Sequence, residues 1–173
     1  MYRLVKWVDT GLSWVLIFLT IVMVLDVSWQ VFTRFIMKDP SSFTEELATF
    51  LLIWIGLLGS AYALRQKAHL GIDIMTIKMK PETRYVWEFL IYSVVIIFSV
   101  LVLIWGGFRL VNITLYLNQI SAALRIKMGY VYSVVPITGF LMIFYSIFFM
   151  VEAYQHLKTH RFEKVEHSTI GID

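Results

Sequence analysis

The sequence contains no cysteine and few charged residues. Of its 173 residues, none is Cys and 16% are Asp, Glu, Lys or Arg. Without a thiol, the chain can form no disulfide, thiolate nucleophile or cysteine metal site. The charges gather in short clusters between long uncharged stretches, a pattern that argues against an ordinary soluble domain.

Residues that carry catalysis are also scarce. The four histidines all lie outside the long apolar stretches: His69, His156, His160 and His167. No facing pair could therefore ligate a haem between membrane helices, and His69 is more typical of a solvated loop than of a metal ligand. The sequence has no nucleotide loop, zinc motif or Ser/His/Asp set, and no basic stripe suited to nucleic acid. We expect a protein that is not an enzyme, has no cofactor of its own and binds no nucleic acid.

Hydrophobic residues dominate the composition. They make up 59% of the chain, with 13 Phe, 9 Tyr and 6 Trp. At a rise of ~1.5 Å per residue, four apolar stretches are long enough to cross a bilayer. We predict an all-α integral membrane protein with one membrane domain over residues 1–173. The predicted spans are roughly 11–34, 44–64, 85–110 and 128–152, followed by a polar tail at 157–173 that is solvated or disordered.

The connection between the second and third spans has the pattern of a short amphipathic helix. Leu70, Ile74 and Ile77 recur at helical spacing, so we predict a helix over 69–80 that lies in the membrane interface. Basic side chains in and after this segment would face lipid headgroups. They are Lys78, Lys80 and Arg84.

The distribution of basic residues predicts the orientation. Four spans put both termini on one side. Counting Lys and Arg gives ten on the side of the termini and the middle connection, and five on the other. The positive-inside rule then places both termini in the cytoplasm.

Two adjacent carboxylates, Glu45 and Glu46, precede the second apolar run. Ser42 and Glu45 have the spacing of a capping box, and a carboxylate in a first turn also meets the positive end of the helix dipole. This leaves Glu46 unexplained. It could pair with Arg34 at the end of the first span, where an unpaired ion is unfavourable, or face another subunit.

Asp26 is the one ionisable residue well inside a predicted span. It shares a helical face with Gln30 and Arg34, at steps of four residues. Lipid would not tolerate this polar stripe, whereas protein would. Three interpretations stay open: a structural hydrogen bond within the bundle, a contact with a partner protein, and a role in carrying protons or ions.

Two further features concern how the helices pack. Gly56 and Ser60, like Gly59 and Ala63, are small residues four apart, a spacing that lets another helix approach closely. Pro136 in the fourth span removes one backbone hydrogen bond and should kink that helix. We regard these positions as structural or subunit-interface candidates.

Two segments together resemble a known family. Their order along the chain resembles that of the DctQ-like small membrane subunit of tripartite ATP-independent periplasmic (TRAP) transporters. Gln30 and Arg34 come first, followed by FTEELATFLLIWIGLLGSAYALRQKAHLGID at 43–73 and then QISAALRIKMGYVYSVVPITG at 119–139. The positions that match the family pattern are Gln30, Arg34, Glu46, Arg65, His69, Asp73 and Pro136. The chain departs from that pattern at Lys127, where a proline is expected.

The resemblance implies a multi-pass protein of the bacterial inner membrane with no chemistry of its own. In such transporters a large multi-helix subunit holds the sodium and substrate sites, and a soluble periplasmic protein captures an organic acid. Sialic acids and C4-dicarboxylates are both open as substrates. The small subunit would scaffold the large one, among membrane lipids.

The binding protein would need a docking surface on the periplasmic side. We expect Arg109, Arg125 and Lys127 to provide positive charge for an acidic patch on it. Two other classes stay open: a self-contained proton-coupled carrier that uses Asp26, and an assembly factor or receptor subunit.

Overall fold

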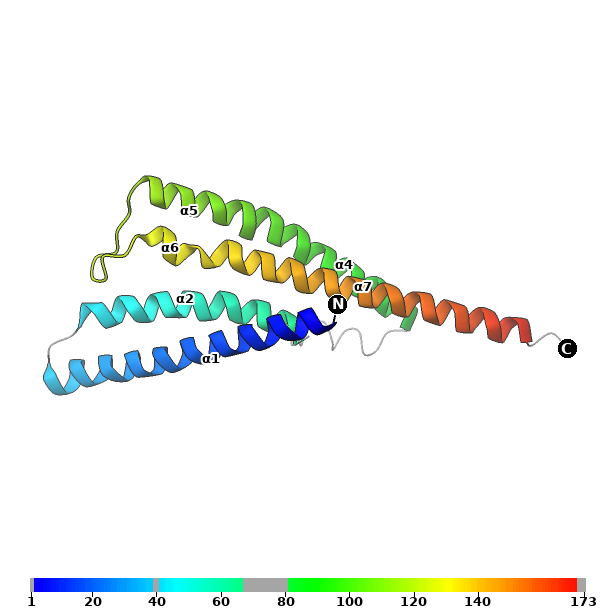
Figure 1. Cartoon of the computed structure of the whole chain (residues 1–173), viewed down its shortest axis with the longest axis horizontal. Helices are drawn as coiled ribbons and strands as arrows, with labels where there is room; N and C mark the ends of the chain where they lie inside the picture. Colours follow the sequence, from blue (N-terminus) through cyan, green and yellow to red (C-terminus); the bar gives the residue numbers. More distant parts are fainter. Residues whose placement is uncertain (1, 39–40, 67–80, 171–173) are drawn as a thin grey trace.

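The structure is a computed structural model that describes the backbone of residues 2–38, 41–66 and 81–170 and the side chains of 3–38, 41–66 and 87–154 (Figure 1). The predicted interfacial helix at 69–80 lies outside the described residues. The same holds for four of the candidate side chains: His69, Asp73, Lys78 and Lys80. Arg84 lies in a described helix, but its side chain is outside the described set.

Helices make up nearly all of the described chain. They are α1 (Tyr2–Phe32), its π-helical extension η1 (Thr33–Met37), α2 (Ser42–Arg65), α4 (Pro81–Phe98), the π-helical stretch η2 (Ser99–Gly106), α5 (Gly107–Tyr116), α6 (Met128–Tyr132) and α7 (Val134–Ile170). Four helical rods are long and apolar enough to cross a membrane: Arg3–Met37, Ser42–Arg65, Trp87–Tyr116 and Met128–Tyr154. The prediction of an all-α membrane protein with four spans is confirmed.

The rods form two packed pairs (Figure 1). One pair is α1 with α2, and the other is the continuous rod of α4, η2 and α5 with the rod of α6 and α7. Contacts between α2 and α7 join the pairs. The start of α2 and the loop after α5 lie at one end of the bundle, which we call the loop end, whereas the N-terminus and the end of α2 lie toward the other, which we call the terminal end.

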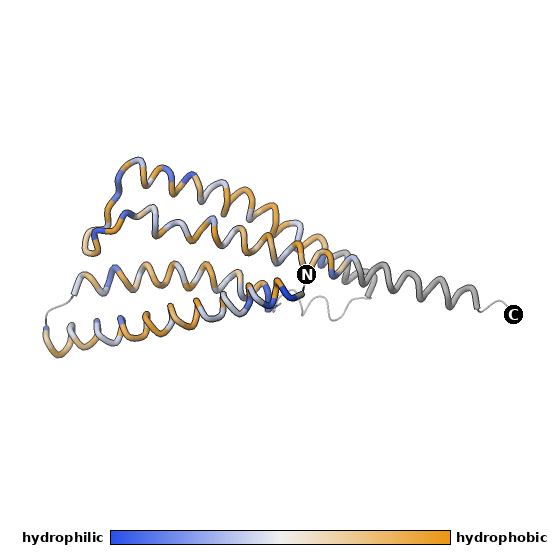
Figure 2. The backbone as a smooth tube through the Cα atoms, viewed as in Figure 1, coloured by the Kyte–Doolittle hydropathy of each residue, from blue (hydrophilic) through white to orange (hydrophobic). Residues whose placement is uncertain are grey.

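The first and third rods contribute little to the core. In the most apolar window of each rod, 6% of the residues are buried in the first and 11% in the third, against 44% in the fourth. Figure 2 shows hydrophobic residues along α1, and many of its large apolar side chains are exposed, among them Trp14, Phe18 and Leu25. These two rods therefore present apolar surface to whatever surrounds the bundle.

Close packing of the second pair depends on glycines. A Cβ atom at Gly129 would lie 2.5 Å from Leu115, and one at Gly139 would lie 2.8 Å from Ile104. A Cβ at Gly56 or Gly59 would meet nothing within 4 Å. Neither glycine of the small-residue pattern in the second span is therefore closely packed within the described chain.

The fourth rod is interrupted where the sequence predicts a kink. Pro136 has no N–H to offer the carbonyl of Tyr132, and the helix breaks at Ser133, between α6 and α7. The Ile137 amide then reaches the Ser133 carbonyl at a long 3.4 Å. Beyond the span, the backbone is helical through Ile170.

Candidate functional site

At the loop end, the side chain of Glu46 reaches from the start of α2 to the loop after α5. Its Oε1 accepts a hydrogen bond from the Ala122 amide at 3.1 Å. Its Oε2 accepts from the amides of Ala123 and Leu124, both at 2.8 Å. Three successive backbone N–H groups thus surround one carboxylate, an arrangement known as an anion-binding nest.

The loop itself, residues 117–127, is closed by short backbone bonds. The Ser121 amide donates to the Ile126 carbonyl at 2.9 Å, and the Met128 amide donates to the Gln119 carbonyl at 2.9 Å. Arg125 has φ 53°, in the left-handed region that non-glycine residues rarely adopt. Backbone of this kind persists where the surrounding contacts fix it. Here the carboxylate of Glu46, on α2, supplies such a contact at Leu124, the residue before Arg125.

The predicted pair of Glu46 with Arg34 is wrong. Both carboxylate oxygens of Glu46 are engaged by loop amides, and no ion pair joins Glu46 to Arg34 in the described part of the chain. Arg34 is exposed in η1. Three converging backbone donors engage both oxygens of the carboxylate, so it is satisfied without an arginine. The residue types Ala, Ala and Leu give no sign of this role.

The predicted capping box is also wrong. Helix α2 begins at Ser42, so its N-cap is Ser41, which makes no side-chain capping bond. Thr44 instead donates its hydroxyl to the Ser41 carbonyl at 2.9 Å. Glu45 is exposed in the first turn, where its charge can still interact with the helix dipole.

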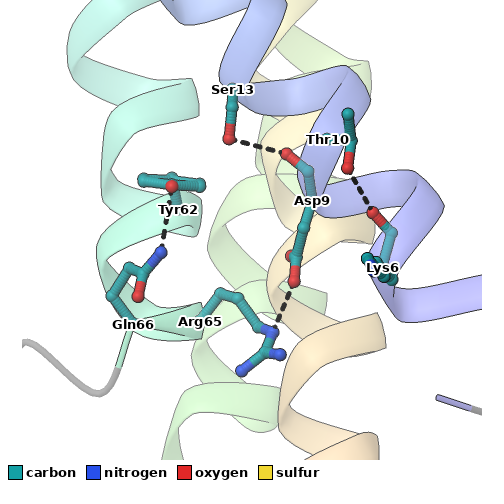
Figure 3. Close-up of polar contacts among 7 residues, drawn as sticks. All are labelled: Lys6, Asp9, Thr10, Ser13, Tyr62, Arg65 and Gln66. Atoms are coloured by element: carbon teal, nitrogen blue, oxygen red, sulfur yellow. Dashed lines mark hydrogen bonds and ion pairs between the residues drawn. The ribbon is translucent and has the colours of Figure 1, made fainter.

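At the terminal end, Arg65 of α2 contacts residues of α1 and α7, and Figure 3 shows its bond to Asp9 of α1. Its Nε donates to Oδ2 of Asp9 in α1 at 2.8 Å, with the two side chains 30% and 22% exposed. Its guanidinium carbon lies 5.8 Å and 5.7 Å from the ring centroids of Phe148 and Phe149 in α7. Arg65 therefore combines an ion pair with cation–π contacts.

Sequence reasoning singled out Arg65 but missed Asp9 and Tyr145. Tyr145 is fully buried in α7 and lies close enough to Asp9 and Arg65 to interact with both electrostatically. Asp9 is a lone acid near the start of the first rod, and Arg65 ends the second. Because consecutive spans run antiparallel, these two charges had to lie at the same end, and this signal could have identified the pair.

A third contact between the helix pairs lies between the two ends. The indole Nε1 of Trp54 in α2 donates to the Val131 carbonyl in α6 at 3.0 Å. Buried indole N–H groups usually find such a partner. Nothing in the sequence indicated this bond, because its acceptor is a backbone group.

The polar stripe along α1 and η1 runs from a buried to an exposed position. Asp26 is 8% exposed, Gln30 is half-buried and Arg34 is exposed. Oδ2 of Asp26 has no hydrogen-bond partner among the described residues. The stripe therefore does not close into a network within the described chain, and the three interpretations of Asp26 stay as predictions.

The three basic residues expected to dock a partner are exposed. Arg109 lies in α5, whereas Arg125 and Lys127 lie in the loop held by Glu46. In the described part of the chain, no group of three or more His, Cys, Asp or Glu side chains could hold a metal ion.

Comparison with known proteins identifies the family to which this chain is similar. The family model of the DctQ component of tripartite ATP-independent periplasmic transporters matches residues 23–156. The chain is 27% identical over 117 residues to the sialic acid TRAP transporter small permease protein SiaQ of Vibrio cholerae, covering 68% of this chain and 66% of that protein. It is also 27% identical over 115 residues to the sialic acid TRAP transporter permease protein SiaT of Haemophilus influenzae.

The aligned segment accounts for 66% of this chain but only 18% of SiaT. The chain thus spans just under two thirds of SiaQ and a small part of SiaT. The family match itself extends from α1 through α7 and includes Glu46, Arg65 and Pro136. Together with the four apolar rods, it shows that this protein is a multi-pass membrane protein of the DctQ family of tripartite ATP-independent periplasmic transporters.

Proposed function

We propose that this chain is the small membrane subunit of a TRAP transporter and scaffolds a large multi-helix permease subunit. One observation carries the proposal: in SiaT, the segment similar to this chain is 18% of a much longer permease protein. A protein built like this chain therefore occurs in one polypeptide with a larger permease portion. The large subunit would be the partner of the present chain.

The structure supports a scaffold role in two ways. The first and third rods expose apolar surface along their length, which suits contact with lipid and with a larger membrane protein. Polar contacts at both ends and in the middle, made by Glu46, Trp54 and Arg65, hold the helix pairs together. A transport pathway needs several polar groups that converge near the membrane midplane, and Asp26 alone offers little for one.

In this proposal the complex takes up an organic acid with sodium, and the sodium and substrate sites lie in the large subunit. The names of SiaQ and SiaT support a sialic acid as substrate, and a C4-dicarboxylate is the other candidate. The complex lies in the bacterial inner membrane with both termini cytoplasmic. The loop end is then periplasmic, and Arg109, Arg125 and Lys127 face the soluble substrate-binding protein.

Affinity purification tests the scaffold role. The tagged chain is isolated from its native membranes in mild detergent, and the proteins that accompany it are identified by mass spectrometry. We expect a large multi-helix membrane protein at constant stoichiometry, and uptake by proteoliposomes only when both chains are present. Purification of the chain alone, with uptake intact, would contradict the proposal.

The second candidate is a self-contained proton-coupled carrier. The observation that favours it is the buried carboxylate of Asp26, with one oxygen unpartnered in the described chain. This candidate requires transport by the chain alone and loss of that transport in Asp26→Asn. The same two measurements therefore separate the candidates.

A further inference from the structure

The loop end carries an excess of exposed positive charge. Its exposed basic residues are Arg34, Lys38, Arg109, Arg125 and Lys127. Among the described acidic residues there, Glu45 is exposed, whereas the carboxylate of Glu46 is occupied by the amides of the 117–127 loop. Because Glu46 binds backbone groups, it leaves the basic side chains of this loop unpaired with it.

We infer that Glu46 is a positioning residue for a docking surface. By binding the amides of Ala122, Ala123 and Leu124, it holds the loop in the conformation that presents Arg125 and Lys127 together to an acidic face of the substrate-binding protein. This inference rests on the proposed function. It adds to that function the role of the Glu46 carboxylate in shaping the docking surface.

The position of Arg125 follows directly from this contact. Arg125 comes immediately after Leu124, whose amide is bound to Glu46 at 2.8 Å. On its other side, the Ile126 carbonyl is bound by the Ser121 amide. The left-handed residue is thus held between two fixed points, and its side chain projects from a backbone conformation that a free loop would rarely adopt.

Lys127 is held by the same closed loop. Its backbone pairs with Ile120 in an antiparallel bridge, and the next amide, that of Met128, is bound to the Gln119 carbonyl. Ile120 and Ile126 are exposed beside the two basic residues, at 57% and 41%. The surface therefore combines apolar and basic side chains.

Binding of Glu46 by backbone amides, rather than by a basic side chain, has a consequence for the charge of the docking surface. A carboxylate paired with Arg125 or Lys127 would neutralise part of the surface that attracts an acidic partner. Charges at the rim of an interface mainly increase the rate of encounter, and they do so only while they are exposed and unpaired. Glu46 stabilises the loop and leaves those charges available.

The test uses the whole transporter in proteoliposomes. Uptake is measured against the concentration of substrate-loaded binding protein for Glu46→Gln, with Glu45→Gln, the exposed neighbouring carboxylate, as matched control. We expect Glu46→Gln to raise the half-saturating concentration about fivefold through slower encounter, with the maximal rate unchanged. We expect Glu45→Gln, which removes one exposed negative charge without touching the loop amides, not to raise the half-saturating concentration. Hydrogen exchange of the amides of residues 122–124 should accelerate in Glu46→Gln only.

A structural role alone would produce a different pattern. A lower maximal rate with an unchanged half-saturating concentration in Glu46→Gln would overturn the inference. If Glu46→Gln assembles poorly, Glu46→Ala is measured with added formate, a small carboxylate that fits the emptied nest, and with chloride as control. Recovery of the half-saturating concentration with formate alone supports the inference, and equal values in both salts overturn it.

The double variant Arg125→Glu/Lys127→Glu separates this inference from the docking part of the proposed function. If the double variant leaves the half-saturating concentration unchanged, the loop is not a docking surface and both ideas fail. If it raises that concentration while Glu46→Gln does not, the docking surface stands and the role of Glu46 is wrong.

Discussion

The two ends of the bundle are held together by different chemistry. At the terminal end, Arg65 pairs with Asp9 at 2.8 Å and lies near the rings of Phe148 and Phe149, so four side chains from three helices meet. At the loop end, Glu46 meets the backbone of a loop, and no second charge takes part. The first arrangement fixes helices relative to each other, whereas the second fixes the shape of a loop.

This difference determines what each end loses when its charged residue is removed. Without Arg65, the carboxylate of Asp9 stays partly buried with no counter-charge, and an uncompensated charge in such a place is strongly unfavourable. Without Glu46, the three loop amides, of which one is exposed and two are partly buried, can be hydrated by water. We therefore expect stability to depend mainly on the terminal end and docking mainly on the loop end.

The largest effect on stability is expected for Arg65→Ala. The Asp9–Arg65 pair is 22% and 30% exposed, between the surface and fully buried cases, so its loss should lower the free energy of unfolding by about 2 kcal/mol. The measurement is a titration with a denaturing detergent, followed by intrinsic tryptophan fluorescence.

A double-mutant cycle provides the control for this prediction. Asp9→Asn removes the negative charge, so Asp9→Asn/Arg65→Ala should be more stable than the sum of the single effects implies. Strict additivity of the two substitutions would show that the pair is not coupled. The loss would then come from packing of the arginine on the two phenylalanines.

A smaller effect is expected for Glu46→Ala. Because water can replace the carboxylate at the loop amides, the melting temperature in detergent should fall by about half as much as in Arg65→Ala, or less. Differential scanning fluorimetry of the two variants side by side makes the comparison. A larger fall for Glu46→Ala would mean that the loop end determines the stability of the bundle, and the assignment of roles to the two ends would be reversed.

The sequence predicts the helices of this protein better than its contacts. Four spans follow from apolar runs that are long enough to cross a bilayer, and the break at Ser133 follows from the missing N–H of Pro136, since each depends on the residues themselves. The helix of the first rod begins before the predicted span at 11–34. Residues 3–10 include the charged residues Lys6 and Asp9, so a search for apolar runs leaves this segment out of the span. In the folded bundle, Asp9 is paired with Arg65.

The partners of the polar residues were harder to predict, for a physical reason. The sequence predicts pairing of Glu46 with Arg34 because charged side chains are visible in it. The backbone donors of Ala122, Ala123 and Leu124 are common to almost every residue. Which amides point toward a carboxylate depends on a loop conformation that includes a left-handed Arg125. No residue pattern in the loop specifies that conformation.

The smallest effect is expected between the two ends, at Trp54. Its indole N–H donates to the Val131 carbonyl, and Trp54→Phe removes this bond while keeping an aromatic ring. Hydrogen bonds between membrane helices contribute about 0.6 kcal/mol on average, so the free energy of unfolding should fall by about that amount. Trp105→Phe is the matched control because Trp105 is 68% exposed on the third rod, and it should change stability even less. A loss in Trp54→Phe equal to that in Arg65→Ala would show that the middle of the bundle, rather than its terminal end, holds the two helix pairs together.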